Sequence, residues 1–390
     1  MTLLLTASRG LSAEPAAWEA RLEALEAEVR ALREENAELR RYLEVAAPPA
    51  SERTERPPKA ATVTPAGKAT VLKLNGLVQA QAEFGDRGDS RGAANDRIRL
   101  RRVRIGAAGQ FLEHLDFKVE GEYAGSSVSL MDGWLNWNRF DAANIKAGQF
   151  KAPFGFETLF SDPKLATAER TLGSDRLTLG RQVGVQASGD FLERRLSYAV
   201  GAFNGNGQNV TSNDNENFTY VARLEGVFWN GELASMPAKL SGGINGFTGN
   251  DTNVTVGSDF GFTDNRFTGE RTGSGVDAQF EAGPFELWAE WLNVRFAPSV
   301  PVAGPEFDAS SWYVQAGYDV LPGVVQVVLR HDAFDPNDLR TNDDVHTWTV
   351  GTNWFVKGDD LKLQVNYNIV DMPAPTPKQE QLILRSQVIF

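Results

Sequence analysis

Alternation is strict in the stretch Leu115-Asp116-Phe117-Lys118-Val119-Glu120-Gly121-Glu122-Tyr123, where every even position is charged and every odd position is apolar or small. Successive side chains of a β-strand point to opposite faces, so a period of two predicts a strand with one apolar and one charged face. A row of charged groups on the inner face is too polar for a dry core. It indicates a strand that separates lipid from water.

The same period recurs from residue 72 to the end of the chain. We expect an all-β fold with sixteen antiparallel strands, an even number as in bacterial outer-membrane barrels. A soluble β-sandwich also alternates, but several polar faces here suit a water-filled lumen better. The predicted strands are 72–84, 97–110, 114–124, 128–138, 142–151, 180–190, 195–204, 218–229, 238–249, 274–282, 285–296, 310–320, 323–333, 345–356, 360–370 and 381–390.

The connections between these segments support a transmembrane barrel. Tight turns at 111–114, 190–193 and 321–323 alternate with long polar loops at 85–96, 205–217, 250–273 and 297–309. Short turns on one rim and long loops on the other are typical of outer-membrane barrels, as are aromatic residues near strand ends. The chain also closes on an alternating strand that ends in Phe390.

Composition excludes several functions. The chain has 390 residues, a formal net charge of −12, no Cys and 3 His. Without Cys there is no disulfide, thiol nucleophile or Cys-ligated metal, and the acidic balance argues against nucleic acid as a partner. No apolar run reaches the length of a transmembrane helix, and no G-x-S-x-G, H-E-x-x-H or P-loop motif is present. We expect no enzymatic activity, no catalytic residues, no metal site and no cofactor.

The first 68 residues differ from the rest. Residues 1–13 look like the remnant of a signal peptide, with a disordered N-terminus as the alternative. Residues 14–45 carry a heptad seam with Asn36 at one a position and oppositely charged g/e pairs, which predicts a parallel coiled coil rather than a single amphipathic helix. Residues 46–68 are rich in Pro and Ala and predict an extended linker. Residues 69–390 form the predicted barrel.

Three stretches resemble the phosphate-selective porins O and P. They are Arg101-Arg102-Val103-Arg104-Ile105-Gly106 with the alternating segment after it, Gly148-Gln149-Phe150-Lys151-Ala152-Pro153-Phe154-Gly155, and Arg181-Gln182-Val183-Gly184-Val185-Gln186 with Tyr198–Gly205. The resemblance covers about residues 70–390. It implies a homotrimer of sixteen-stranded barrels in the bacterial outer membrane, an inward-folded third loop, and an anion-selective pore lined by Arg and Lys. The coiled coil is an extension found in part of the family, and we expect it in the periplasm.

The resemblance places the arginine-rich motif on a predicted strand. Along this strand the alternation between the two faces shifts by one residue at Arg101-Arg102. Arg97, Arg99 and Arg101 share one parity with Val103 and Ile105, so a regular strand would put some guanidinium groups in lipid. A β-bulge at Arg101-Arg102 would let all five arginines face water. Snorkelling at the rim is the alternative. The candidate pore-lining and anion-binding residues are Arg97, Arg99, Arg101, Arg102, Arg104, Lys118, Lys146 and Lys151.

Residues 152–176 follow Lys146 and Lys151 and are the predicted constriction loop. We expect an outer-membrane porin for passive diffusion of small ions, with a preference for phosphate, polyphosphate or similar oxyanions. The acidic groups concentrated in residues 201–390 argue against assuming that selectivity. A non-selective porin, or a structural protein that contacts outer-membrane lipid and tethers the periplasmic envelope through its coiled coil, remains an alternative.

Overall fold

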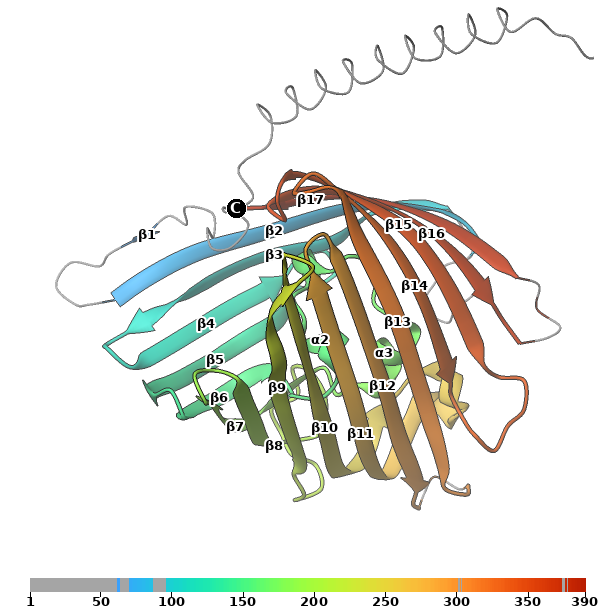
Figure 1. Ribbon diagram of the computed structural model, residues 1–390. Helices are drawn as coiled ribbons and strands as arrows, with labels where there is room; N and C mark the ends of the chain where they lie inside the picture. Colours follow the sequence, from blue (N-terminus) through green and yellow to red (C-terminus); the bar gives the residue numbers. More distant parts are fainter. Residues whose placement is uncertain are drawn as a thin grey trace, which may run out of the picture. The chain divides into compact units, whose positions relative to one another are not determined.

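The computed structural model describes residues 62–63, 70–86, 96–300, 302, 304–373, 376 and 378–390. In these residues seventeen strands form one antiparallel sheet. β1 (Thr62–Val63) pairs only with β2, and each of the strands β2 to β17 pairs with its neighbours in the chain. β17 then pairs with β2, which closes a barrel of sixteen strands (Figure 1).

Each of the sixteen strands overlaps a segment that the alternation predicts. They are β2 (Thr70–Gly85), β3 (Arg97–Phe111), β4 (Leu115–Glu122), β5 (Ser129–Phe140), β6 (Ala143–Lys151), β7 (Arg181–Phe191), β8 (Leu196–Phe203), β9 (Thr219–Leu233), β10 (Met236–Thr255), β11 (Arg266–Ala282), β12 (Phe285–Pro298), β13 (Phe307–Leu321), β14 (Val325–Asp335), β15 (Val345–Lys357), β16 (Leu361–Asp371) and β17 (Gln379–Ile389). The short helices are α2 (Phe156–Leu159), η2 (Asp162–Lys164), α3 (Leu172–Leu177), η3 (Ser258–Phe260) and η4 (Thr263–Asn265).

The connections divide the barrel into two rims. Turns of two to four residues join the strands at one rim, which we call the short-turn rim. At the other, the long-loop rim, six to 29 residues separate consecutive strands. The expected contrast between rims is therefore confirmed.

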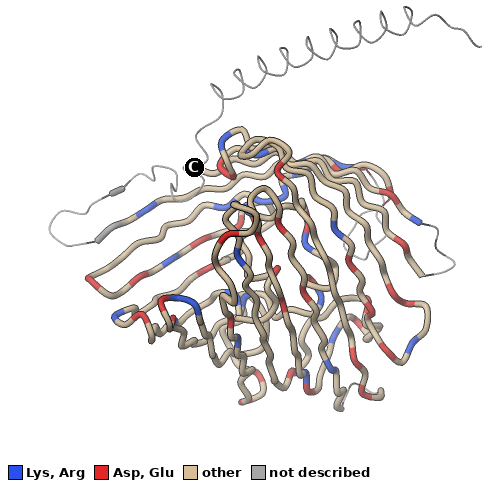
Figure 2. Tube along the Cα trace, viewed as in Figure 1, with Lys and Arg blue, Asp and Glu red and all other residues tan. Residues whose placement is uncertain are grey.

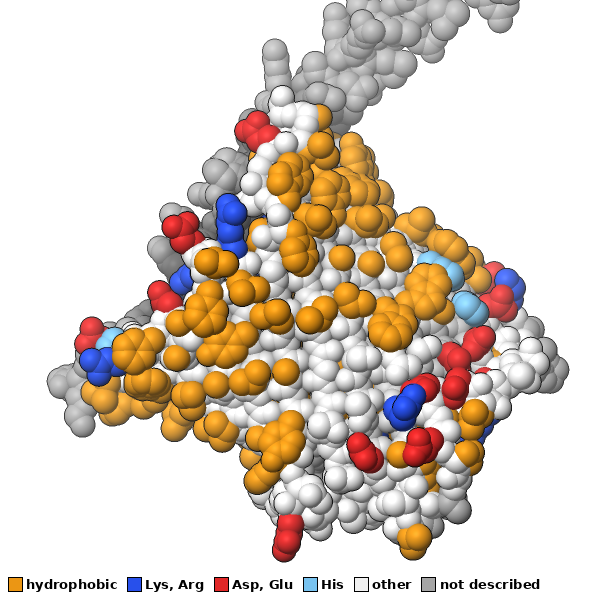
Figure 3. Space-filling model, turned by 60° about the horizontal axis from the view of Figure 1, so that its bottom comes forward, with side chains coloured by type: hydrophobic (Ala, Val, Ile, Leu, Met, Phe, Trp, Pro, Cys, Tyr) orange, Lys and Arg blue, Asp and Glu red, His pale blue; other side chains and the backbone are white. Residues whose placement is uncertain are grey.

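The outer wall is apolar and the inner wall is polar. Leu, Val and Ile side chains are exposed along the outer faces of the strands, and Trp291 and Trp312 form an exposed cross-strand pair. Figure 3 shows these apolar side chains spread over the wall. Basic and acidic residues are interspersed over the strands (Figure 2), and several that point inward are buried, such as Arg223, Asp277 and Arg330. No helix in the described residues is long and apolar enough to cross a membrane.

The hairpin of β10 and β11 is longer than the alternation predicts, and the prediction of its loop is wrong. A loop was expected at 250–273, but β10 runs to Thr255 and β11 starts at Arg266. Inside this extension Phe267 is fully buried and packs against Phe296 and Phe262, and Arg271 forms an ion pair with Asp251. The buried aromatic rings and the ion pair stabilise strands whose exposed residues are polar, so composition alone suggested a loop.

The longest connection, residues 152–180 between β6 and β7, folds into the barrel (Figure 1). We call it the inner loop; it contains α2, η2 and α3. Most of its residues are buried, and Phe154, Leu172 and Leu177 join an apolar cluster formed with inward-facing residues of the wall. The predicted constriction loop is thus present in the lumen. The predicted signal peptide, coiled coil and most of the linker lie outside the described residues.

Candidate functional site

The five arginines of β3 all face the interior because the strand contains a bulge. Gln79 of β2 pairs with Arg102, and Ala80 pairs with Leu100, so Arg101 is the extra residue. Before the bulge Ile98 and Leu100 are exposed on the outer wall, and after it Ile105 is exposed. The bulge predicted from the parity slip is therefore confirmed, and it keeps every guanidinium group out of lipid.

Near the long-loop rim, the first two arginines share one carboxylate. Arg97 Nη2 lies 2.8 Å and Arg99 Nη2 lies 2.7 Å from Glu83, a buried residue of β2. On the far side of the bulge, Arg104 Nε donates to Glu122 at 2.9 Å. These arginines are ion-paired with the wall itself.

The middle of the row of β3 arginines holds the inner loop. Arg101 donates two hydrogen bonds to Glu169, at 2.7 and 2.8 Å. Arg385 of β17 donates to the same carboxylate at 2.8 Å. Glu169 of the inner loop therefore joins two strands, β3 and β17, from inside the barrel.

Asp162 of η2 makes the second attachment. Its carboxylate lies 3.2 Å from Arg102 and 2.5 Å from both Arg104 and Arg170. Burial by itself would raise the pKa of Asp162, but the positive charges of Arg102, Arg170 and Arg104 outweigh it and hold that pKa well below the usual range. Arg385 and Arg101 overcome burial in the same way and lower the pKa of Glu169. Both carboxylates are thus held in the charged form.

Strands β12, β15 and β16 bind the backbone of the inner loop. Lys362 donates to the Pro163 carbonyl at 2.6 Å, and Asn353 donates to the Ala166 carbonyl at 2.8 Å. In the opposite direction, the Phe156 and Glu157 amides at the start of α2 donate to Glu290. Because these partners are buried, the inner loop is fixed to one side of the barrel.

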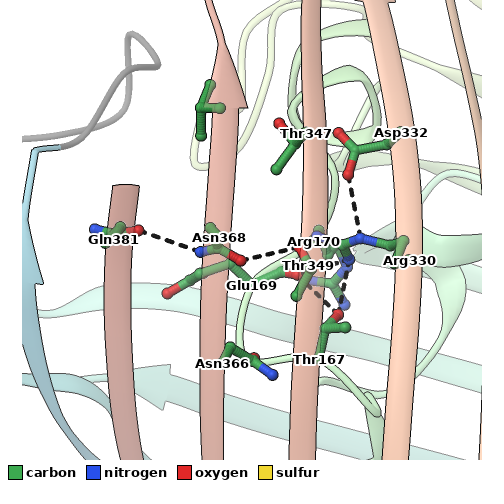
Figure 4. Close-up of a pocket in the computed structure, with 11 residues that line it drawn as sticks. Thr167, Glu169, Arg170, Arg330, Asp332, Thr347, Thr349, Asn366, Asn368 and Gln381 are labelled. Carbon is green, nitrogen blue, oxygen red and sulfur yellow. Dashed lines mark hydrogen bonds and ion pairs between the residues drawn. The ribbon is translucent and has the colours of Figure 1, made fainter. Parts of the chain in front are cut away.

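A small polar cavity remains between the inner loop and this wall (Figure 4). Its volume is about 20 Å³, which is room for about one water molecule. Arg330 lies 3.2 Å from Asp332 and donates to Thr167 at 2.7 Å, and Thr349 donates to Asn368 at 2.9 Å. The cavity belongs to the attachment and is too small to conduct solutes.

A larger cavity lies on the opposite side of the inner loop. We call it the passage; its volume is about 340 Å³. Lys151, Arg170 and Arg181 line it together with one carboxylate, Asp175, and the remaining lining residues are Thr158, Ser174, Thr178, Leu179, Gly180 and Gln208. The side chains facing the passage therefore carry an excess of positive charge.

The cations near the passage differ in their partners. Lys151 donates to the Phe160 carbonyl at 3.1 Å, and no carboxylate of the described residues lies within ion-pair distance of it. Arg181 and Lys118 both pair with Asp132, at 2.8 and 2.7 Å. Cationic groups with few fixed counter-charges can replace part of the hydration shell of an anion.

Lys146 lies against aromatic rings of the wall. Its ammonium group is 4.8 Å from the centre of the Trp134 ring and 5.3 Å from that of Phe150. The described residues show no ion pair for it. Stacking on aromatic faces stabilises a cation without neutralising it.

The structure thus separates the eight predicted residues into two groups. The residues that form ion pairs with buried carboxylates are Arg97, Arg99, Arg101, Arg102, Arg104 and Lys118. Lys146 and Lys151 of β6 have no ion pair within the described residues. Sequence reasoning did not rank Arg170 and Arg181, which line the passage. Arg181 begins a strand opposite Lys151 in the β6–β7 pairing, and that register was the available signal.

Several buried acidic residues of the second half have specific partners. Asp277 accepts two hydrogen bonds from Arg223, at 2.6 and 3.0 Å, and Glu290 accepts from the inner loop.

Within the described residues, one group of side chains has the spacing of metal ligands: Asp335, Asp343 and Asp344, whose carboxylate oxygens lie within 4.8 Å of one another. They lie at the end of β14 and in the loop after it.

Solved structures share this fold. An anion-selective porin from Comamonas acidovorans is 15% identical, with a TM-score of 0.58 over 82% of this chain and 100% of its own. The outer-membrane channel DcaP of Acinetobacter baumannii is also 15% identical, with a TM-score of 0.56 over 85% and 100%. In-vitro folded OmpT of Vibrio cholerae is 11% identical, with a TM-score of 0.58 over 85% and 100%. At these identities the likeness shows the fold alone.

Among curated protein sequences, none matches the chain. A family model does match, over residues 72–388. This range includes β3, which we call the arginine strand, the inner loop and the closing strand β17. The chain therefore belongs to the family described as phosphate-selective porin O and P, and it is an outer-membrane porin.

Proposed function

We propose that this porin is an anion-preferring diffusion channel for phosphate or similar small oxyanions. The observation that supports the proposal best is the passage lining, in which three cations and one carboxylate face the cavity. Arg170 and Arg181 are paired with Asp162 and Asp132, whereas Lys151 has no carboxylate partner within the described residues. At a narrow point in water-filled protein, local charge decides which ion is concentrated. Lys146, which has no ion pair within the described residues, extends the positive charge along the neighbouring wall.

In this proposal the arginine strand has a supporting role in selectivity. Its five side chains are ion-paired, and Arg101, Arg102 and Arg104 bind carboxylates of the inner loop. They keep the loop against one wall and thereby leave the opposite side open beside Lys151. Transported anions then meet Lys151, Arg170 and Arg181 first.

We further propose that three copies assemble and that the coiled coil of residues 14–45 lies in the periplasm. OmpT of Vibrio cholerae, which has the same fold, has been solved in a trimer form. The g/e charge pairs of the heptads match in a parallel assembly. β1, which lies within the predicted linker, pairs with β2 next to the short-turn end of the barrel.

Planar-bilayer measurement of the reversal potential in a KCl gradient tests the ion preference. We expect an anion-preferring wild-type channel whose chloride current is blocked by phosphate. The variant Lys151→Gln/Arg181→Gln removes two positive charges from the passage and should reduce the preference severalfold, since a charge at about 6 Å is worth on the order of 3 kcal/mol before screening.

Arg194→Gln is the matched control, because Arg194 lies in a short turn and its side chain is 79% exposed. This control should leave the reversal potential unchanged. Wild-type cation preference would reject the proposal. The absence of any preference would favour the non-selective porin.

A further inference from the structure

The loop between β8 and β9 begins with Gly205-Asn206-Gly207-Gln208-Asn209. Three alternate residues have positive φ angles: 84° at Gly205, 95° at Gly207 and 65° at Asn209. Gly and Asn adopt this left-handed conformation at little cost. The sequence therefore allows the chain to turn back on itself directly after β8.

Two buried glutamines of the wall hold this segment. Gln149 of β6 accepts a hydrogen bond from the Asn209 amide at 2.7 Å and donates to Asn209 Oδ1 at 2.9 Å. Gln182 of β7 accepts from the Gly207 amide at 3.0 Å. Gln149 is 4% exposed and Gln182 is 3% exposed. These reciprocal, buried bonds connect residues 205–209 to the same two strands that carry Lys151 and Arg181.

The attachment places Gln208 at the passage. Its side chain lines the cavity together with Lys151, Arg181 and Arg170. The Nε2 atom donates to the Leu130 carbonyl at 2.7 Å and contacts Ser129 Oγ at 3.2 Å. The side chain is thus fixed by β5 and does not simply extend into solvent.

We propose that residues 205–209 are a second constriction element and that Gln208 is a specificity-determining residue of the channel. The inner loop narrows the lumen from one direction, and Gln208 narrows it from another. The Gln208 amide adds polar contacts and bulk but no charge. It therefore affects which solutes are excluded by size, while the cations that line the passage attract the anion. The charge part of this inference rests on the proposed anion preference; the position of Gln208 does not.

The absence of native cysteine makes a direct test possible, because Gln208→Cys introduces the single thiol of the chain. The folded variant is treated in a planar bilayer with a negatively charged and a positively charged methanethiosulfonate reagent. We expect either reagent to reduce the single-channel conductance severalfold. The negative reagent should react about tenfold faster, because positive potential in a narrow site concentrates anions.

Gln110→Cys is the control, since Gln110 lies near the end of β3 and donates to the Glu113 carbonyl of a short turn. Its modification should leave conductance unchanged. Complete labelling of the thiol in the Gln208→Cys variant without a change in conductance would overturn the constriction. A conductance loss with faster labelling by the positive reagent would support the constriction and instead reject the proposed anion preference.

A second variant tests the attachment. Gln149→Leu removes both bonds to Asn209. Asn209→Gly removes the side-chain bonds to Gln149 and Ser129 while retaining a residue that tolerates positive φ. Variants that show the heat-modifiable mobility of a folded barrel should have larger conductance and weaker exclusion of large anions, with the greater change in Gln149→Leu. Wild-type conductance and size exclusion in both would overturn the attachment.

Discussion

Arg102 and Lys151 both carry a positive charge but have different surroundings. Arg102 is 3% exposed, donates to Gln79 at 2.8 Å and pairs with Asp162. Lys151 lines the passage and is held by a backbone carbonyl. A buried ion pair stabilises position, whereas a cation without a fixed carboxylate partner interacts with mobile ions. We therefore expect these residues to affect different properties.

Arg102→Ala should lower the stability of the barrel by about 1.5–3 kcal/mol, because it removes charge-assisted hydrogen bonds while Arg104 and Arg170 still neutralise Asp162. Thermal loss of the fast-migrating folded band on electrophoresis measures this change. Lys151→Ala should leave that temperature nearly unchanged and alter the reversal potential instead. Equal effects of the two substitutions on both measurements would contradict this separation of roles.

Among the elements, the inner loop combines a polar attachment with an apolar one. Asp162 and Glu169 bind arginines of β3 and β17, and Phe154, Leu172 and Leu177 pack into the apolar cluster. The charged part depends on pH and the apolar part does not. Removal of the charged part should therefore loosen the loop without unfolding the barrel.

Acid provides that test. The pKa values of Asp162 and Glu169 are lowered in the folded protein, so their contribution is fully present above the ordinary carboxyl range and is lost as pH falls through the lowered values. Single-channel current should be steady from neutral pH to about pH 4 and become noisy below it. Asp162→Asn should be noisier than wild type already at neutral pH, and a quiet variant would contradict the attachment.

For the whole molecule, association is expected to depend mainly on the barrel walls. The predicted heptad seam of residues 14–45 spans fewer than four full heptads and has Asn36 at one a position, which favours register at a cost in stability. Deletion of residues 14–45 should therefore weaken trimers without abolishing them. Native electrophoresis and light scattering check this, and a truncated protein that is entirely monomeric would identify the coiled coil as the main source of association.

The sequence by itself determined the barrel, because alternation along each strand is a local property that lipid and water impose on opposite faces. It also located the bulge at Arg101, since five arginines on both parities of one strand cannot all avoid lipid without it. The inner loop was predictable from the Pro153 and Gly155 segment after β6. The strand count and most boundaries followed in the same way.

Only the tertiary structure decided which charges are neutralised. Glu83 and Arg385 lie at opposite ends of the described chain, yet barrel closure brings β17 beside β2 and places both near the arginine strand. No local pattern reveals that Glu169 binds Arg101 and Arg385, or that Gln149 holds Asn209. Ion pairs across a closed barrel depend on register and on the path of an inward loop, and both are fixed by contacts between residues far apart in sequence.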